Sequence, residues 1–209
     1  MTPFTTIEGR AAPLMKTNVD TDVIIRIERI TAGERSKLGT YALEALRYRP
    51  DGSENTDFVF NQPKYRQAPI LIAGKNFGCG SSREGAVWAL MGMGLRCVIA
   101  ESFGDIFYGN CFQNGMLPVR LPASVVQSLV EESLASDAPF TVDLEHGLLK
   151  TPSGKQITFT VDALRRESLL TGLDEVGLTL KCNDEIEAWQ ASDRGARPWI
   201  WTASANPMR

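Results

Sequence analysis

The chain has 209 residues, of which 43% are hydrophobic and 22% are charged, and its formal net charge at pH 7 is −3. This is the composition of one globular domain with a core of its own, and it excludes a disordered or fibrous protein. The sequence has no basic run, no signal-peptide pattern and no apolar stretch long enough to span a bilayer. We therefore expect a soluble, cytoplasmic protein that binds neither nucleic acid nor a membrane.

Cysteine and histidine usage narrows the possible chemistry. The cysteines Cys79, Cys97, Cys111 and Cys182 form no Cys-x-x-Cys pair. This spacing predicts free thiols in a reducing compartment and no metal site held by this chain alone. His146 is the one histidine, in a segment that is typical of an exposed hairpin tip. Unless His146 is the base, catalysis by a Ser–His or Cys–His pair is excluded, and the chemistry depends on hydroxyls, carboxylates, arginines or a cofactor.

The first two thirds of the chain alternate between helical and extended patterns. Residues 36–48 have apolar side chains at helical spacing. Short apolar runs at 69–73 and 96–100 predict buried strands, and the segment 82–93 between them has helical spacing. Together these three segments predict a βαβ unit with a right-handed crossover and parallel strands.

The remaining elements complete a single α/β domain with a mixed sheet and flanking helices. We expect a strand at 116–121, an antiparallel hairpin within 140–161, a helix from Asp162 to Gly172, and a last helix near 184–190. A helix at 123–136 is also expected, and its inward side chains are Val126, Leu129, Val130 and Leu134.

Near the C-terminus the pattern of the domain ends. We assign residues 1–193 to the domain and 194–209 to a tail that is partly disordered or docks on a partner. Trp199 and Trp201 lie in this tail. Two tryptophans so near a terminus either pack back on the domain or contact a partner protein.

Residues 76–85, with the sequence NFGCGSSREG, join the first predicted strand to its helix, where α/β proteins bind anions. Arg83 occupies the position of the third glycine of a dinucleotide fingerprint, and Ala86 replaces the lysine of a P-loop, so neither motif is present. A helix N-terminus beside a guanidinium is suited to a carboxylate. The structural alternative is a capping box formed by Ser81 and Glu84, and the two interpretations are compatible.

Two further segments are rich in polar residues. Residues 18–25, NVDTDVII, begin like a calcium-binding loop, but Val23 and Arg29 occupy the glycine and glutamate positions, so calcium is excluded. The alternative is a polar turn that leads into a strand. Residues 103–115, FGDIFYGNCFQNG, predict a partly buried polar loop near the carboxyl end of the sheet.

The order and separation of these three segments resemble the small subunits of 3-isopropylmalate dehydratase, a family of the aconitase superfamily. The similarity extends from about Ile7 to about Trp189. It implies a swivelling β/β/α domain, equivalent to the mobile fourth domain of aconitase. The implied activity is that of a hydro-lyase subunit that interconverts 2-isopropylmalate and 3-isopropylmalate through isopropylmaleate in leucine biosynthesis.

The resemblance also implies roles for individual residues. Ser81 aligns with the serine that takes a proton from the substrate carbon, and Arg83 aligns with an arginine that binds a substrate carboxylate. Ser82 aligns with a supporting hydroxyl, and Asp22 aligns with an active-site aspartate. The resemblance thereby implies that Thr21, Asp22, Ser82 and Arg83 bind the substrate. The [4Fe-4S] cluster, a Lewis acid for the departing hydroxyl, is expected on a separate large subunit. This chain is then active only with that partner, on a small dicarboxylate.

Three positions depart from the family pattern: Arg26, Gly85 and the segment 33–39. In related enzymes the last of these reaches the variable side chain of the substrate, so Arg29, Glu34 and Arg35 are candidate specificity residues. Whether Arg26, Arg29 or Arg35 contacts a second carboxylate stays open. Two alternatives follow: a paralogous hydratase subunit for a diacid of the homoaconitate, citramalate or dimethylmaleate type, and a non-catalytic carboxylate-binding module.

Overall fold

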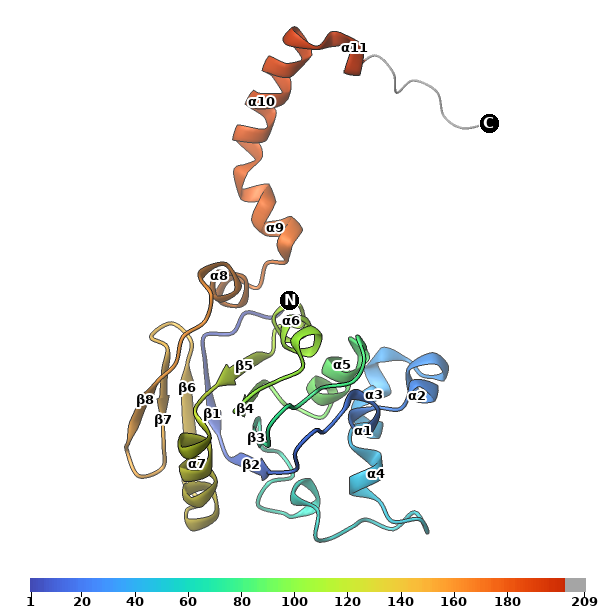
Figure 1. Cartoon of the computed structure of the whole chain (residues 1–209), viewed down its shortest axis with the longest axis vertical. Coiled ribbons are helices and arrows are strands. Elements are labelled where there is room, and N and C mark those ends of the chain that lie inside the picture. Colours follow the sequence, from blue (N-terminus) through green and yellow to red (C-terminus); the bar gives the residue numbers. More distant parts are fainter. Residues whose placement is uncertain (202–209) are drawn as a thin grey trace. The chain divides into compact units, whose positions relative to one another are not determined.

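The computed structural model, shown in Figure 1, describes residues 1–201 of the chain. Its contacts divide the chain into two units, Met1–Gly172 and Leu173–Arg209. The boundary expected at 193/194 falls inside a helix, α10 (Asn183–Ala196), so the backbone continues without a break at that point. The assignment of residues 1–193 to one domain stays a prediction.

A four-stranded parallel sheet forms the centre of the N-terminal unit. Its order is β2-β3-β4-β5, with strands β2 (Ala11–Leu14), β3 (Ile70–Ala73), β4 (Cys97–Ala100) and β5 (Leu117–Arg120). Every residue of β3 and β4 is buried, which explains their uninterrupted apolar sequence. Helix α5 (Gly85–Gly92) connects these two strands, so the predicted parallel βαβ unit is confirmed.

A separate antiparallel sheet has the order β1-β6-β7-β8. Its strands are β1 (Thr6–Gly9), β6 (Phe140–Asp143), β7 (Leu148–Lys150) and β8 (Gln156–Thr158). The expected hairpin is thus a three-stranded meander to which the N-terminal strand adds. The predicted α/β fold with both parallel and antiparallel pairing is confirmed, and the two kinds of pairing lie in two separate sheets. The pairing types separate because helices connect the parallel strands, whereas short turns join β6, β7 and β8.

The single helix expected at 36–48 is broken into short pieces. The structure has η1 (Arg35–Lys37), α3 (Leu38–Tyr41) and α4 (Glu44–Arg47) in this region, preceded by α1 (Thr21–Ile24) and α2 (Ile27–Ala32) and followed later by η2 (Val59–Asn61). The break comes at Leu43, whose φ is +55° and whose N–H donates to the carbonyl of Ile24 at 2.8 Å. A tertiary hydrogen bond therefore overrides the local helical pattern.

The polar loop expected at 103–115 is instead a helix, α6 (Asp105–Asn114). Phe107 and Cys111, one helical turn apart, are buried together with Phe112. Burial of this apolar face stabilises a helix that the glycine, asparagine and aspartate content argued against. A further helix, α8 (Ala163–Thr171), confirms the expected cap: Asp162 accepts hydrogen bonds from the N–H groups of Leu164 and Arg165.

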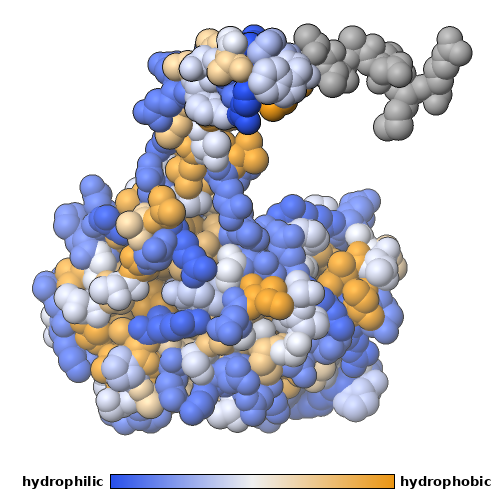
Figure 2. All heavy atoms as spheres, turned by 45° about the horizontal axis from the view of Figure 1, so that its top comes forward, coloured by the Kyte–Doolittle hydropathy of each residue, from blue (hydrophilic) through white to orange (hydrophobic). Residues whose placement is uncertain are grey.

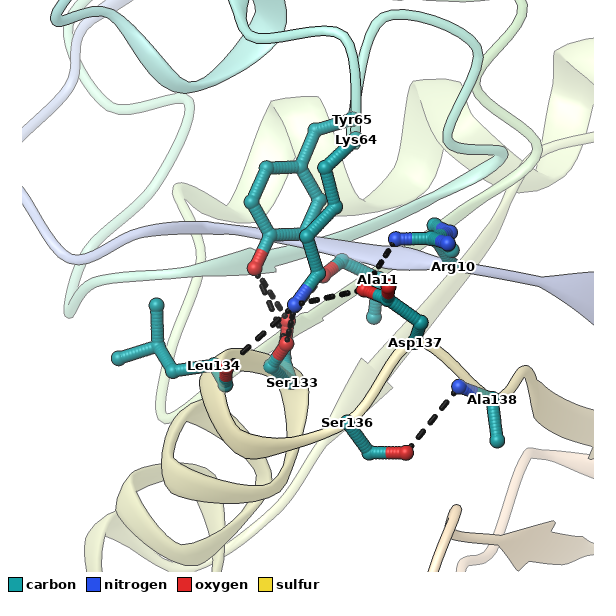
Figure 3. Close-up of polar contacts among 9 residues, drawn as sticks. All are labelled: Arg10, Ala11, Lys64, Tyr65, Ser133, Leu134, Ser136, Asp137 and Ala138. Carbon is teal, nitrogen blue, oxygen red and sulfur yellow. Dashed lines mark hydrogen bonds and ion pairs between the residues drawn. The ribbon is translucent and has the colours of Figure 1, made fainter.

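Helix α7 (Ala123–Ala135) differs from expectation at its C-terminal end. The expected inward residue Leu134 is 62% exposed, whereas Ser133 is buried. The Ser133 hydroxyl donates to the carbonyl of Ala11 at 2.6 Å, and the Tyr65 hydroxyl and Lys64 ammonium donate to the Ser133 carbonyl at 3.0 and 2.8 Å. Figure 3 shows these side chains gathered at the helix end. Their hydrogen bonds fix the rotation of α7, which sequence periodicity alone did not predict.

The parallel sheet separates two hydrophobic cores because alternate side chains of a strand point to opposite faces. Leu71 and Val98 belong to the core that α5 covers. Ile70, Ile72 and Ile99 belong to the core shared with α7 and the antiparallel sheet. Both faces of the sheet are therefore held rigidly, and the loops at its ends start from fixed positions.

The C-terminal unit is helical, with α9 (Glu175–Thr179), η3 (Leu180–Cys182), α10 and α11 (Pro198–Trp201). The Trp201 indole donates to Asp193 at 2.9 Å and lies under the Arg194 guanidinium, so it packs on its own unit. Val176, Leu180, Trp189, Trp199 and Ile200 are large side chains exposed on this unit. Figure 2 shows hydrophobic residues interspersed with hydrophilic ones on the surface of the molecule. The expected tail beyond residue 201 lies outside the described residues. No helix within residues 1–201 has the length and hydropathy that crossing a membrane requires.

Candidate functional site

Loops that leave three neighbouring parallel strands run side by side at one edge of the sheet. After β2 and β3, the Gly78 N–H donates to the Val19 carbonyl at 2.7 Å, and the Thr21 N–H donates to the Cys79 carbonyl at 3.0 Å. After β4, the Gly104 N–H donates to the Phe77 carbonyl at 2.9 Å. Ligands of α/β proteins bind at the carboxyl ends of the strands, and the three polar segments of the sequence meet there.

The loop after β3 depends on Gly78. Its φ is +72°, and a Cβ at this position would overlap the ring of Phe107 in α6. The rings of Phe77 and Phe107 pack edge to face with centroids 5.6 Å apart. The turn is therefore packed directly on α6, which places the following residues, including Ser81, at the sheet edge.

Ser81 lies against the first polar segment. Its Oγ is 3.0 Å from Thr21 Oγ1, and its N–H donates to the same Thr21 oxygen at 3.3 Å. The Thr21 side chain is buried, with 1% of the residue exposed, whereas Ser81 keeps partial exposure. Thr21 in turn begins α1, where Asp20 accepts the Val23 N–H at 2.8 Å, so the expected turn into a strand is instead a capped helical turn.

The capping box of Ser81 and Glu84, which was the structural alternative for this segment, does not form. Helix α5 begins at Gly85, and no side chain caps it. The Ser81 hydroxyl is engaged by Thr21, and the Glu84 carboxylate accepts from Asn114 Nδ2 at 2.8 Å. The Ser81 hydroxyl therefore has no capping role in α5.

Arg83 forms an ion pair with Asp22 across the same edge. The Arg83 side chain is 23% exposed and that of Asp22 59% exposed, so the pair is open to solvent on the Asp22 side. Ser82 is exposed beside it, with its carbonyl 3.5 Å from Asn110 Nδ2. The structure thus brings together the five residues expected to form the site: Thr21, Asp22, Ser81, Ser82 and Arg83.

The candidate specificity residues have different surroundings. Arg29 donates to Glu44 at 3.1 Å, and this hydrogen bond together with the Glu44 charge raises the pKa of Arg29. Glu34 pairs with Lys37 at 3.3 Å on the surface. Arg35 instead lies 4.1 Å from the centroid of the Trp88 ring and donates to Asn114 Oδ1 at 3.1 Å. Arg35 is thereby linked to α5 and to the residue that follows Arg83.

Gly85, where the family pattern differs, is closely packed. A Cβ at this position would lie 2.6 Å from Cδ1 of Ile30 in α2. Any side chain at residue 85 would therefore require Ile30 to move.

Sequence reasoning missed Trp88, Asn110 and Asn114 as residues that border the site. The two asparagines are four residues apart, which places them on one face of α6. The high density of amide side chains in residues 103–115 was a signal for these residues. It points to Asn110 and Asn114 only when the segment is known to be a helix, because the helix places them on one face.

His146 and the buried cysteines Cys97 and Cys111 have surroundings of their own. Nδ1 of His146 lies 2.8 Å from Asp143, on the exposed turn between β6 and β7. Burial raises the pKa values of Cys97 and Cys111. Within residues 1–201, no three Cys, His, Asp or Glu side chains are arranged to hold a metal ion.

A hollow of about 580 Å³ lies at the amino ends of β2 and β3, the opposite edge of the sheet from Ser81, and Arg10, Lys64 and Arg66 contribute to its lining. Arg10 and Lys64 both pair with Asp137, as Figure 3 shows, and Arg66 pairs with Glu54. These cations are neutralised within the fold, and the hollow contains none of the candidate site residues.

Comparison with known proteins adds independent information. The family model of the aconitase C-terminal domain matches residues 1–124. The 3-isopropylmalate dehydratase small subunit of Gluconacetobacter diazotrophicus is 50% identical over 95% of this chain and 97% of that protein. The small subunit of Paracoccus denitrificans is 48% identical over 96% of this chain and 100% of that protein.

A solved structure agrees with these relatives. The crystal structure of 3-isopropylmalate dehydratase from Methanocaldococcus jannaschii matches with a TM-score of 0.63 and 28% identity, over 88% of this chain and 99% of that one. The chain belongs to the aconitase C-terminal domain family, among the small subunits of 3-isopropylmalate dehydratase.

Proposed function

We propose that this chain is the small subunit of a hydro-lyase that isomerises 2-isopropylmalate and 3-isopropylmalate through isopropylmaleate in leucine biosynthesis. Family membership over almost the whole chain supports the reaction. The observation that carries the proposal for the site is the convergence of Ser81, Thr21 and the Arg83–Asp22 pair at the carboxyl edge of the parallel sheet.

Ser81 is the proposed general base, which takes the proton from the substrate carbon. A serine hydroxyl is a weak base unless its alkoxide is stabilised. The Thr21 hydroxyl, 3.0 Å away, can donate a hydrogen bond to that alkoxide, and the positive end of α5 and the Arg83 guanidinium follow directly in the chain. Since Thr21 is buried, its proposed role is to position Ser81 and not to contact the substrate.

Arg83 is the proposed ligand of one substrate carboxylate, supported by the Ser82 hydroxyl. A guanidinium offers two parallel hydrogen bonds that match the two oxygens of a carboxylate. Asp22 holds the Arg83 guanidinium at the sheet edge through their ion pair. An arriving carboxylate competes with Asp22 for the same donors.

Arg35 is the proposed ligand of the second carboxylate. Arg26 and Arg29 share the single carboxylate of Glu44, at 3.7 and 3.0 Å, so each of them already has a partner within the protein. Among residues 1–201, no carboxylate lies within ion-pair distance of Arg35, although Trp88 and Asn114 hold its guanidinium. Of the three specificity candidates, Arg35 therefore suits a substrate anion, whereas Arg29 and Glu34 are occupied by protein partners.

The designation of the relatives as small subunits implies a large-subunit partner. We propose that this partner carries the [4Fe-4S] cluster, which supplies a Lewis acid for the departing hydroxyl. The described residues of this chain contribute the base and the carboxylate contacts. Four cysteines outside any disulfide support a reducing, cytoplasmic location.

The test is an anaerobic assay of this chain mixed with the large subunit of the same organism and a reconstituted cluster. Alkene absorbance is followed from 3-isopropylmalate, with each subunit alone as the control. Turnover that requires both chains supports the proposal. A stable complex that is silent with isopropylmalate but active with homoaconitate-, citramalate- or dimethylmaleate-type diacids would contradict the proposed substrate and favour a paralogous hydratase.

A further inference from the structure

Asn114, at the C-terminal end of α6, uses every hydrogen-bonding position of its side-chain amide. Nδ2 donates to the Glu84 carboxylate at 2.8 Å and to the Asn110 carbonyl at 2.9 Å. Oδ1 accepts from the Trp88 indole at 2.8 Å and from Arg35 at 3.1 Å. An amide has two donor hydrogens and two acceptor lone pairs, so its orientation is fixed by its four partners.

These partners come from three separate elements. Arg35 begins η1, Trp88 lies within α5, and Glu84 precedes α5 and follows Arg83 in the chain. The Arg35 guanidinium is stacked on Trp88 with a separation of 4.1 Å from the ring centroid, while Asn114 accepts from its edge. The Trp88 ring contacts the guanidinium, and the Asn114 side-chain oxygen accepts from one of its N–H groups. Together these two contacts fix the position of the Arg35 cation.

Helix α6 also supports the neighbouring backbone. Asn110, one turn before Asn114, directs its side-chain amide toward the Ser82 carbonyl at 3.5 Å. One face of α6 thus contacts the segment 82–84 and, through Asn114, the arginine of η1. The distance between Arg35 and the Arg83 segment consequently depends on a side chain that belongs to neither.

We propose that Asn114 is a positioning residue that holds Arg35 at a fixed distance from the Arg83 segment, so that the two guanidinium groups match the two carboxylates of a diacid. This inference rests on the proposed function of Arg35 and Arg83. An amide suits this position because Asn114 accepts a hydrogen bond from the Arg35 cation and donates one to the Glu84 carboxylate. An aspartate would repel Glu84 and neutralise Arg35, and an alanine would release both.

The test is a double-mutant cycle in the reconstituted two-subunit enzyme, with Asn114→Ala, Arg35→Ala and the double variant. We expect Asn114→Ala to raise KM for the diacid about five- to tenfold, as loss of a hydrogen bond to a charged group does, with kcat within about twofold. The double variant should have the KM of Arg35→Ala, because Asn114 acts through Arg35. An unchanged KM in Asn114→Ala, or independent effects of the two substitutions, would overturn the proposal.

Gln127→Glu on α7 is the matched control for Asn114→Asp. Gln127 donates to Glu131 at 3.5 Å on the exposed face of α7, so the substitution makes the same change from amide to acid opposite a glutamate. We expect Asn114→Asp to raise KM and Gln127→Glu to leave it unchanged. Equal effects of the two variants would show that a nonspecific loss of stability, and not positioning, is responsible.

Amide hydrogen exchange in the full small-subunit chain tests the same inference without turnover. The peptide 34–38 contains the hydrogen bonds of η1, from Lys37 to Glu34 and from Leu38 to Arg35. Asn114→Ala should accelerate exchange there, and Gln127→Glu should not. Unchanged exchange would overturn the positioning role, whereas a wild-type complex without turnover would contradict the proposed function alone.

Discussion

The hydroxyl oxygens of Thr21 and Ser81 lie 3.0 Å apart although 60 residues separate them in the chain. The contact forms because the loops after β2 and β3 pair through backbone hydrogen bonds beyond the ends of the strands. It places the buried hydroxyl of Thr21 behind the partly exposed hydroxyl of Ser81.

Ser81→Ala should reduce kcat of the two-subunit enzyme by roughly 10² to 10⁴, the usual contribution of a general base. The complex should remain intact, because the Ser81 hydroxyl caps no helix. Steady-state kinetics beside size-exclusion chromatography measures both effects. Ser124→Ala, an exposed serine of α7, is the control, and near-normal turnover of Ser81→Ala would remove Ser81 as the base.

Thr21→Val should lower kcat about tenfold with little change in KM, because it removes the hydrogen bond to Ser81 without emptying the site. Thr21→Ser keeps the hydroxyl and should recover most of the loss. The comparison separates the hydrogen bond from packing, since Thr21 is buried. If Thr21→Ser is impaired and Thr21→Val is not, the methyl group and not the hydroxyl matters.

Arg83→Lys should raise KM for the diacid by about ten- to a hundredfold, because an ammonium cannot form two parallel hydrogen bonds with a carboxylate. Arg66→Lys provides the matched control. Arg66 binds Glu54 through two hydrogen bonds, at 3.1 and 2.7 Å, on a surface outside the site, so kinetics should not change. An unaltered KM for Arg83→Lys would exclude Arg83 as a carboxylate ligand.

Gly78→Ala should destabilise the chain far more than Gly52→Ala. Both glycines have positive φ, so alanine costs roughly 1–2 kcal/mol of backbone strain at either position. At Gly78 the added Cβ also overlaps Phe107, which adds roughly 1–3 kcal/mol of overpacking, whereas nothing lies within 4 Å of Gly52. Urea unfolding of the two variants measures the difference, and equal losses would show that Phe107 moves aside.

Stability should depend on His146 at low pH. Its hydrogen bond to Asp143, and then the charge of that carboxylate, raise the pKa of His146 in the folded chain. A raised pKa stabilises the fold fully below the unfolded pKa of about 6.5, and this stabilisation disappears as pH rises through the folded value. His146→Asn should therefore lower the free energy of unfolding more at about pH 5.5 than at about pH 8.5. An equal loss at both values would assign the effect to the turn itself.

The local sequence was sufficient to predict an element where its own residues and their near neighbours decide its conformation. The apolar runs at 69–73 and 96–100 correctly predicted β3 and β4, because both faces of a central parallel strand are buried. The cap of α8 was correct because Asp162 bonds to residues two and three positions later. The same local reasoning failed for residues 36–48 and 103–115, where a hydrogen bond to Ile24 and burial of Phe107 decided the conformation.

The sequence by itself determined the family and the parallel βαβ unit, because these depend on residue order and short-range spacing. Only the tertiary structure decided that the Ser81 hydroxyl contacts Thr21 and does not cap α5, that Arg29 pairs with Glu44, and that Asn114 contacts Arg35. Each of these is a contact between segments distant in the chain. Their geometry is set by how distant loops and helices pack together, which no local pattern encodes.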